Sequence, residues 1–115
     1  MICSVPKCGE ESGSHVICPF HRKSFRRLSK TRQRSILALW HDFVCEKGQQ
    51  PDGRYECFHC ERYFDREEVC GDHWPKSKGA SPQTKFDVEA GVPCCKDCNR
   101  SDNPARFSHD ELSRV

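Results

Sequence analysis

Two cysteine pairs enclose an Asp-His dipeptide, and the second pair is followed directly by an asparagine. In sequence order these are Cys57-Phe-His-Cys60, Asp72-His73 and Cys95-Lys-Asp-Cys98-Asn99. A Cys-x2-Cys knuckle presents two thiolates to one zinc ion, and two knuckles complete a closed tetrahedral site. That zinc would hold Asp72 and His73 close to Asn99. An imidazole suits proton transfer near neutral pH, while carboxylate and amide oxygens suit a hard divalent cation.

Each of these residues also has a purely structural interpretation. A single histidine such as His73 is more often a structural residue or a zinc ligand than a base, and Asn99 could simply cap a helix. Cys94 competes with Cys95 as a ligand, although the Cys-x2-Cys spacing favours Cys95. His59, inside the first knuckle, is expected to be exposed and without a role. The order of the whole set favours the chemical interpretation over these alternatives.

A second set of metal-binding side chains lies near the N-terminus. The spacing C-x4-C-x9-C-x2-H is made by Cys3, Cys8, Cys18 and His21. It fits a zinc site with three thiolates and one imidazole. The alternative is a loose segment with incidental cysteines. We favour zinc, because little else could order a stretch so rich in glycine, serine and proline.

Composition limits the class of protein. The chain has 115 residues, of which 35% are hydrophobic and 31% charged, so one domain with a small core is expected. No apolar run follows the N-terminus as in a secretory signal, and none approaches the roughly 20 residues of a membrane span. Ten cysteines grouped with histidines then favour metal over disulfides, a reducing cytoplasm, and folding that depends on zinc.

The segment from residue 22 to 48 is predicted to be a basic amphipathic helix that ends at Gly48. A break at Ser29 or Thr31 would split it. Its apolar stripe comprises Phe25, Leu28, Ile36, Leu39, Trp40 and Phe43. Its opposite face holds Lys23, Arg27, Lys30 and Arg34, and no acidic residue occurs between Ser12 and His41. A solvated face is the ordinary interpretation, but the absence of acids favours contact with nucleic-acid phosphates. Cys45 would project from the polar side.

The rest of the chain divides into a cysteine-rich module and a tail. Residues 1–21 form the N-terminal knuckle, and a turn at residues 49–53 separates the helical segment from a module at 54–103. Strands are expected at residues 54–57 and 68–71, a loop at 75–83, and a short helix beginning at the second knuckle. Residues 104–115 are a tail. The fold class is therefore small α+β.

The segment from Cys57 to Asn99 resembles the HNH endonucleases, also called ββα-metal or His-Me finger nucleases. Asp72-His73-Trp74-Pro75-Lys76-Ser77-Lys78-Gly79 is similar to their first motif. Val92-Pro93-Cys94-Cys95-Lys96-Asp97-Cys98-Asn99-Arg100-Ser101 is similar to their last. The Asp-His…Asn variant is similar to phage recombination endonucleases that cut branched DNA. The resemblance covers less than half of the chain.

This resemblance implies a zinc-stabilised, treble-clef-like module that hydrolyses DNA in the cytoplasm of a bacterium or a phage-infected host. His73 would be the general base, and Asp72 with Asn99 would hold one Mg²⁺ or Mn²⁺. Where the family has a middle asparagine that braces the base, this chain has Ala90. Phosphate contacts near the pocket would come from Lys76, Lys78 and Arg100. A homodimer would allow two strands to be cut.

Two other functions remain open from the sequence. A non-catalytic zinc module that binds nucleic acid would share the knuckles and the basic face, but it would not require the Asp-His…Asn set. A protein-interaction module would show little salt-dependent affinity for DNA, whereas phosphate binding weakens steeply as salt rises.

Overall fold

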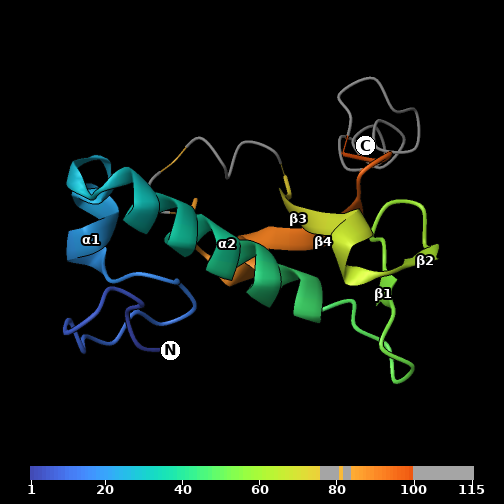
Figure 1. Cartoon of the computed structure of the whole chain (residues 1–115), viewed down its shortest axis with the longest axis horizontal. Coiled ribbons are helices and arrows are strands. Elements are labelled where there is room, and N and C mark those ends of the chain that lie inside the picture. Colours follow the sequence, from blue (N-terminus) through green and yellow to red (C-terminus); the bar gives the residue numbers. More distant parts are fainter. Residues whose placement is uncertain (76–80, 82–83, 100–115) are drawn as a thin grey trace.

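The computed structural model describes residues 1–75, 81 and 84–99, and within them the chain is a small α+β protein (Figure 1). One long helix, α2 (Lys30–Glu46), lies beside an antiparallel pair of strands, β3 (Val69–His73) and β4 (Gly91–Cys95). A second antiparallel pair is formed by β1 (Tyr55–Glu56) and β2 (Tyr63–Phe64). In the described part of the chain, no helix has both the length and the apolar character needed to cross a bilayer.

The prediction of one continuous helix over residues 22–48 is wrong, because the segment divides at Ser29. It forms α1 (Pro19–Lys23), a 3₁₀-helix at Phe25–Arg27, and α2. Leu28 is extended, and the Ser29 hydroxyl accepts a hydrogen bond of 3.1 Å from the Arg32 N–H, which caps α2. This break was the alternative that the sequence left open.

The break changes the surface that the four basic residues form. Lys23 lies on α1, Arg27 on the 3₁₀-helix, and Lys30 and Arg34 on α2. All four are exposed, so they remain available to a polyanion. They lie on three short elements, however, and not on one continuous helical face.

The main core joins the N-terminal segment, α2 and the segment before β4. On α2 the side chains buried in this core are Ile36, Trp40 and Val44, spaced four residues apart, and Cys45 is buried on another side, whereas Leu39 of the predicted stripe is 37% exposed. The ring of Phe25 packs on Phe86 with 4.7 Å between centroids. The predicted N-terminal and cysteine-rich segments therefore share one hydrophobic core.

Backbone hydrogen bonds attach the N-terminal segment to the segment before β4. The Val16 N–H donates to the Phe86 carbonyl, and the Val88 N–H donates to the Ser14 carbonyl, both at 2.9 Å. The Ser14 hydroxyl also donates to Asp87 at 2.6 Å. These bonds fix residues 86–88, which lead through a 3₁₀-helix, η4 (Val88–Ala90), into β4.

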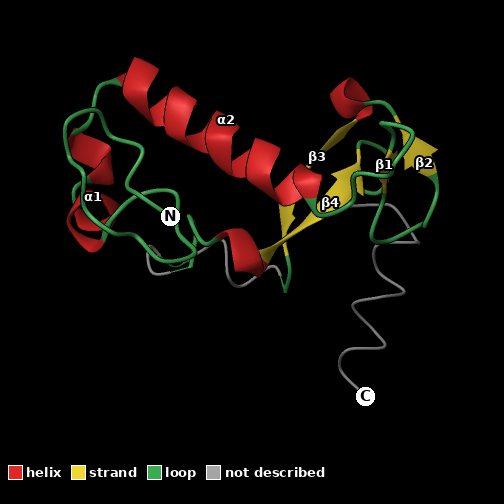
Figure 2. Cartoon of the chain, turned by 90° about the horizontal axis from the view of Figure 1, so that it is seen from below, coloured by secondary structure: helices red, strands yellow, loops and turns green. Residues whose placement is uncertain are grey.

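The helix α2 packs on the β3–β4 pair through Trp40 (Figure 2). A Cβ at Gly71 or at Gly91 would lie 2.7 Å from the indole ring, so both strand positions require glycine to admit it. The Trp40 indole N–H donates to the Asp87 carbonyl at 3.0 Å. One aromatic side chain thus sets the distance between the helix and the two strands.

Gly48 follows the end of α2 but does not act as its C-cap. The helix ends at Glu46 and Lys47 stays in the right-handed region, so no left-handed glycine cap occurs. A Cβ at Gly48 would lie 2.6 Å from the Glu56 carbonyl oxygen and 2.9 Å from the Pro93 ring. The glycine is needed because β1 and β4 approach the backbone closely.

Gly91→Ala should lower the free energy of unfolding by about 1–3 kcal/mol, because the new methyl group overpacks the Trp40 and Val44 contact. Chemical denaturation of the zinc-loaded protein measures the change. Ser35→Ala, at an exposed position of α2, is the control and should have little effect. Equal stability of Gly91→Ala and the wild type would contradict this packing.

Candidate metal centres

Four cysteines from the two predicted knuckles converge at the end of β4. The ligand atoms of Cys57, Cys60, Cys95 and Cys98 all lie within 4.8 Å of one another. The Cys60 and Cys95 sulfurs are 3.9 Å apart. Zinc–sulfur bonds of about 2.3 Å give a tetrahedral edge of about 3.8 Å, so the spacing fits a zinc ion. The predicted cluster is confirmed as a group geometrically suited to zinc, with Cys95 and not Cys94 as its member.

Backbone N–H groups point at these sulfurs and favour thiolates. The Cys95 N–H donates to the Cys57 sulfur at 3.3 Å, and the Cys98 N–H donates to the Cys95 sulfur at 3.4 Å. A hydrogen bond from the Cys94 thiol, together with the N–H groups of Cys95, Cys60 and His59, lowers the pKa of Cys57 to about 3. Burial and the neighbouring Cys95 raise the pKa of Cys98, which a bound cation would offset.

The N-terminal set also assembles as predicted. The ligand atoms of Cys3, Cys8, Cys18 and His21 form a second compact group. The Cys8 and Cys18 sulfurs are 3.8 Å apart, and His21 Nδ1 lies 3.2 Å from the Cys18 sulfur. Pro19 begins α1 directly after Cys18, so the first helical turn returns His21 to the cysteines. This group suits zinc bound by three thiolates and one imidazole nitrogen. All ten cysteines lie in the described ranges, and none forms a disulfide.

A third group forms where the sequence analysis expected an exposed histidine. His59 is buried, with 5% of its surface exposed, and its Nε2 lies 3.4 Å from Oδ2 of Asp72. The sulfur of Cys94 completes a set whose three ligand atoms lie within 4.8 Å of one another. The expectation that His59 is exposed was therefore wrong, because its loop folds back onto β3. Asp72, the predicted metal ligand, lies in a group suited to a metal.

His73, the predicted base, is held by two contacts. Its ring stacks on Trp40 with 4.2 Å between centroids and 15° between planes. Its Nε2 lies 2.8 Å from the Lys85 carbonyl oxygen. A carbonyl only accepts hydrogen bonds, so Nε2 carries the proton and neutral His73 has its lone pair on Nδ1. The Lys85 carbonyl therefore orients the ring.

The structure places Asp72 and His73 on opposite faces of the β3–β4 pair. Successive strand residues alternate in direction. Asp72 faces His59 on one side, whereas His73 faces Trp40 of α2 on the other. The two side chains therefore point away from one another, and His73 is the last residue of β3.

Asn99 is exposed in the turn that follows Cys98, and its N–H donates to the Cys95 carbonyl at 3.0 Å. This bond closes one turn over residues 95–99, at the place where a short helix was predicted to begin. The phosphate contacts predicted near the pocket, Lys76, Lys78 and Arg100, lie outside the described residues.

Cys45 was predicted to project from the polar side of a helix, but it is fully buried behind the four-cysteine cluster. Burial raises its pKa to about 11, so it remains a thiol at neutral pH. It adds apolar volume to the core and lies in none of the three groups of metal-binding atoms found among the described residues.

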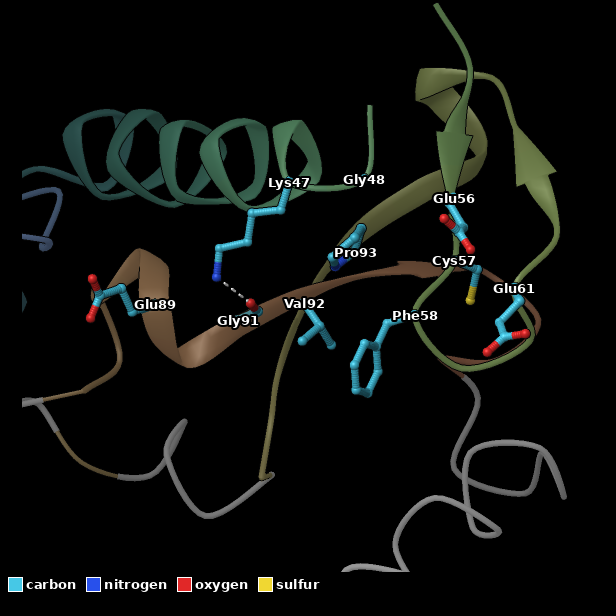
Figure 3. Close-up of a pocket in the computed structure, with 10 residues that line it drawn as sticks. All are labelled: Lys47, Gly48, Glu56, Cys57, Phe58, Glu61, Glu89, Gly91, Val92 and Pro93. Atoms are coloured by element: carbon cyan, nitrogen blue, oxygen red, sulfur yellow. Dashed lines mark hydrogen bonds between the residues drawn. The ribbon is translucent and has the colours of Figure 1, made fainter. Parts of the chain in front are cut away.

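A pocket of about 430 Å³ opens between the end of α2 and β4 (Figure 3). Glu56, Glu61 and Glu89 line it, and its one lysine, Lys47, donates to the Gly91 carbonyl at 2.7 Å. Burial lowers the pKa of Lys47. Three carboxylates against one engaged lysine would repel a phosphodiester, so this pocket is unsuited to nucleic acid.

Cys57→Ser should remove one zinc equivalent and unfold the part of the chain around β1, β3 and β4. Structural zinc contributes on the order of 10 kcal/mol of binding free energy in small domains. Elemental analysis and thermal unfolding measure the two effects. Cys70→Ser is the control, because its thiol lies on β3 and donates to the Cys94 carbonyl at 3.6 Å. Full zinc content in Cys57→Ser would contradict the assignment.

Comparison with protein-family models, with curated proteins and with solved structures found no match to this chain. The assignment of function therefore depends on the side chains and the geometry described above.

Proposed function

We propose that the chain is a metal-dependent endonuclease that hydrolyses DNA phosphodiester bonds. The observation that supports this most directly is the end of β3, where an oriented imidazole and a buried carboxylate occupy adjacent positions. The carboxylate belongs to a group suited to a metal. Phosphodiester hydrolysis requires a general base and a metal ligand that reach the same phosphate, so a phosphate at the end of β3 would have to be reached by these two residues from opposite faces of the strand pair.

His73 would act as the general base through Nδ1. The Lys85 carbonyl holds the proton on Nε2, so the neutral ring can take a proton from water only at Nδ1. The resulting hydroxide would attack phosphorus, and the bond from phosphorus to the 3′ oxygen would break. The leaving 3′ oxygen then takes a proton from solvent. The products would carry 5′-phosphate and 3′-hydroxyl ends.

Asp72 would bind the catalytic cation, and Asn99 would supply an amide oxygen to the same ion. The cation would stabilise the negative charge that develops on the phosphoryl oxygens and the leaving oxygen. The four-cysteine zinc would take no part in the reaction. Its role would be to fix the first knuckle and the end of β4, and thereby the position of Asp72.

The DNA would lie across the exposed basic residues Lys23, Arg27, Lys30 and Arg34. These charges belong to a stretch without acidic residues, so they would attract a polyanion without internal compensation. Because no base-reading motif is present, contact with phosphates and recognition of DNA shape would dominate binding.

A second candidate is a zinc module that binds nucleic acid without cutting it. The stacking of His73 on Trp40 favours this alternative, since a ring with packing and hydrogen-bond partners also serves a structural role. The opposite directions of Asp72 and His73 favour it as well. Both candidates predict DNA binding, and only the first predicts cleavage.

His73→Gln should reduce cleavage of supercoiled plasmid by about 10²-fold or more, because general-base catalysis contributes on that scale. The glutamine amide can still donate to the Lys85 carbonyl, so the fold should be kept. The assay compares wild type and variant with Mg²⁺, with Mn²⁺ and with EDTA, and a binding assay should show unchanged DNA affinity. Undiminished metal-dependent cleavage by the variant would exclude His73 as the base, and zinc-loaded wild type that never cuts would favour the second candidate.

Neutralising Lys23, Arg27, Lys30 and Arg34 to Gln should weaken DNA binding and flatten its dependence on salt. Each phosphate contact contributes about 0.9 to the slope of log affinity against log salt, so four contacts would lower the slope by about 3.6. Fluorescence anisotropy over a range of salt concentrations measures it. Neutralising Lys7 and Arg54, which are exposed elsewhere, is the control. An unchanged slope would show that the basic residues do not contact DNA.

A further inference from the structure

We infer that His59, Asp72 and Cys94 form a third metal site, which binds a transition-metal dication of the Zn²⁺ or Co²⁺ type in preference to Mg²⁺. The inference deepens the proposed function, on which it rests for the role of the ion, because it names two further ligands for the metal at Asp72. Binding of the ion itself can be measured without any cleavage assay.

The spacing of His59 and Asp72 is that of two ligands on one ion. Their nearest atoms, Nε2 and Oδ2, are 3.4 Å apart. Charge-assisted N–H···O hydrogen bonds are shorter, at about 2.7–2.9 Å. Zinc–nitrogen and zinc–oxygen bonds of about 2.0–2.2 Å give a tetrahedral edge of about 3.4 Å. The observed distance therefore matches a shared cation better than a direct ion pair.

Because His59 and Asp72 are buried, a bound cation would stabilise the carboxylate. The side chain of His59 is 0% exposed and that of Asp72 is 10% exposed. A carboxylate removed from water is unfavourable unless a positive charge or several hydrogen bonds compensate it. Cys94 is a thiol that donates to Cys57, and a divalent ion would release this proton on binding. Bound to one carboxylate and the resulting thiolate, the ion would leave the group neutral overall.

Three separate segments bring the ligands together, and each is fixed independently of the ion. His59 lies in the first knuckle, whose Phe58 N–H donates to the Pro93 carbonyl at 2.8 Å. Asp72 lies on β3 and Cys94 on β4. The ring of Trp74 packs edge-on against His59 with 4.9 Å between centroids. The four-cysteine cluster anchors both the knuckle and the end of β4, so the site is organised in advance.

The donor set selects the metal. Imidazole nitrogen and thiolate sulfur favour Zn²⁺ and Co²⁺, whereas Mg²⁺ requires oxygen ligands in octahedral geometry. Cys94 also contacts the four-cysteine group. Its sulfur lies 3.3 Å from the Cys95 carbonyl oxygen, and its thiol hydrogen-bonds Cys57. His59, Asp72 and Cys94 leave a fourth position of a tetrahedral ion, which Asn99 would share with water or a phosphate oxygen by exchange of ligands.

The test is titration of Co²⁺ into the full chain loaded with two zinc ions. We expect one further equivalent to bind, with absorption bands of tetrahedral cobalt and a thiolate-to-cobalt charge-transfer band. His59→Phe and Asp72→Asn should each weaken this binding by more than about 100-fold, since even outer-sphere partners contribute 10–100-fold. Both variants should keep two zinc ions. Cys94→Ser should abolish the charge-transfer band, whereas Cys70→Ser, from the adjacent β3 position, should retain it.

Two results would overturn the site: failure of wild type to bind a third ion, or unchanged cobalt affinity in His59→Phe and Asp72→Asn. Equal competition by Mg²⁺ would overturn its selectivity. Different results decide the nuclease proposal. Cobalt binding by a protein that cuts no DNA supports the site and contradicts catalysis. Mg²⁺-dependent cleavage that is unaffected by His59→Phe overturns the ligand assignment and leaves the nuclease standing.

Discussion

The convergence of four cysteine sulfurs at the end of β4 is the constraint on which the rest of the cysteine-rich module depends. Cys57 follows β1 and Cys95 ends β4, so one cluster joins both strand pairs. The buried residues around it are mostly the cysteines themselves, with Val69 and the thiol of Cys45. Such a small set of apolar groups cannot order two-stranded sheets alone. Four thiolates at this spacing would repel one another, and a zinc ion bound between them would offset the repulsion and join the two strand pairs.

Trp40 performs the corresponding task on the opposite face of β3 and β4. Its indole lies against two glycines, stacks on His73 and donates to the backbone of Asp87. The distance from the helix to the strands and the packing of the His73 ring therefore depend on one side chain. The metal-binding groups lie on one face of the strand pair, and the oriented imidazole lies on the other.

The sequence predicted those parts of the fold that depend on residue type and short spacing. Both zinc clusters and the approximate positions of β1 and β3 follow from knuckle spacing and flanking residues. Helical periodicity was less informative, because the cap at Ser29 resets the phase of α2. Within α2, periodicity also did not show that the four-cysteine group packs against Cys45, which is buried, whereas Leu39 on the predicted stripe is exposed.

Features that depend on tertiary contacts could not be predicted from the sequence. His59 lies in a turn, where side chains are usually exposed, and only the return of β3 beneath it creates its partner. The partner of His73 is the carbonyl of Lys85, and every residue has a carbonyl, so no residue type marks this position. Gly48, Gly71 and Gly91 could be recognised as glycines but not as points of close approach.

The β-bridge between residues 14–16 and 86–88 also has a consequence for the order of events during folding. Ser14 and Asp87 are 73 residues apart, so their pairing closes a loop that spans most of the chain. Closing such a loop costs entropy before any contact is gained, and contacts of this kind form late. During synthesis residues 14–16 emerge first, and they can pair only after residues 86–88 have been made. Lys85, and with it the orientation of His73, would then be fixed only in the last stage of chain assembly.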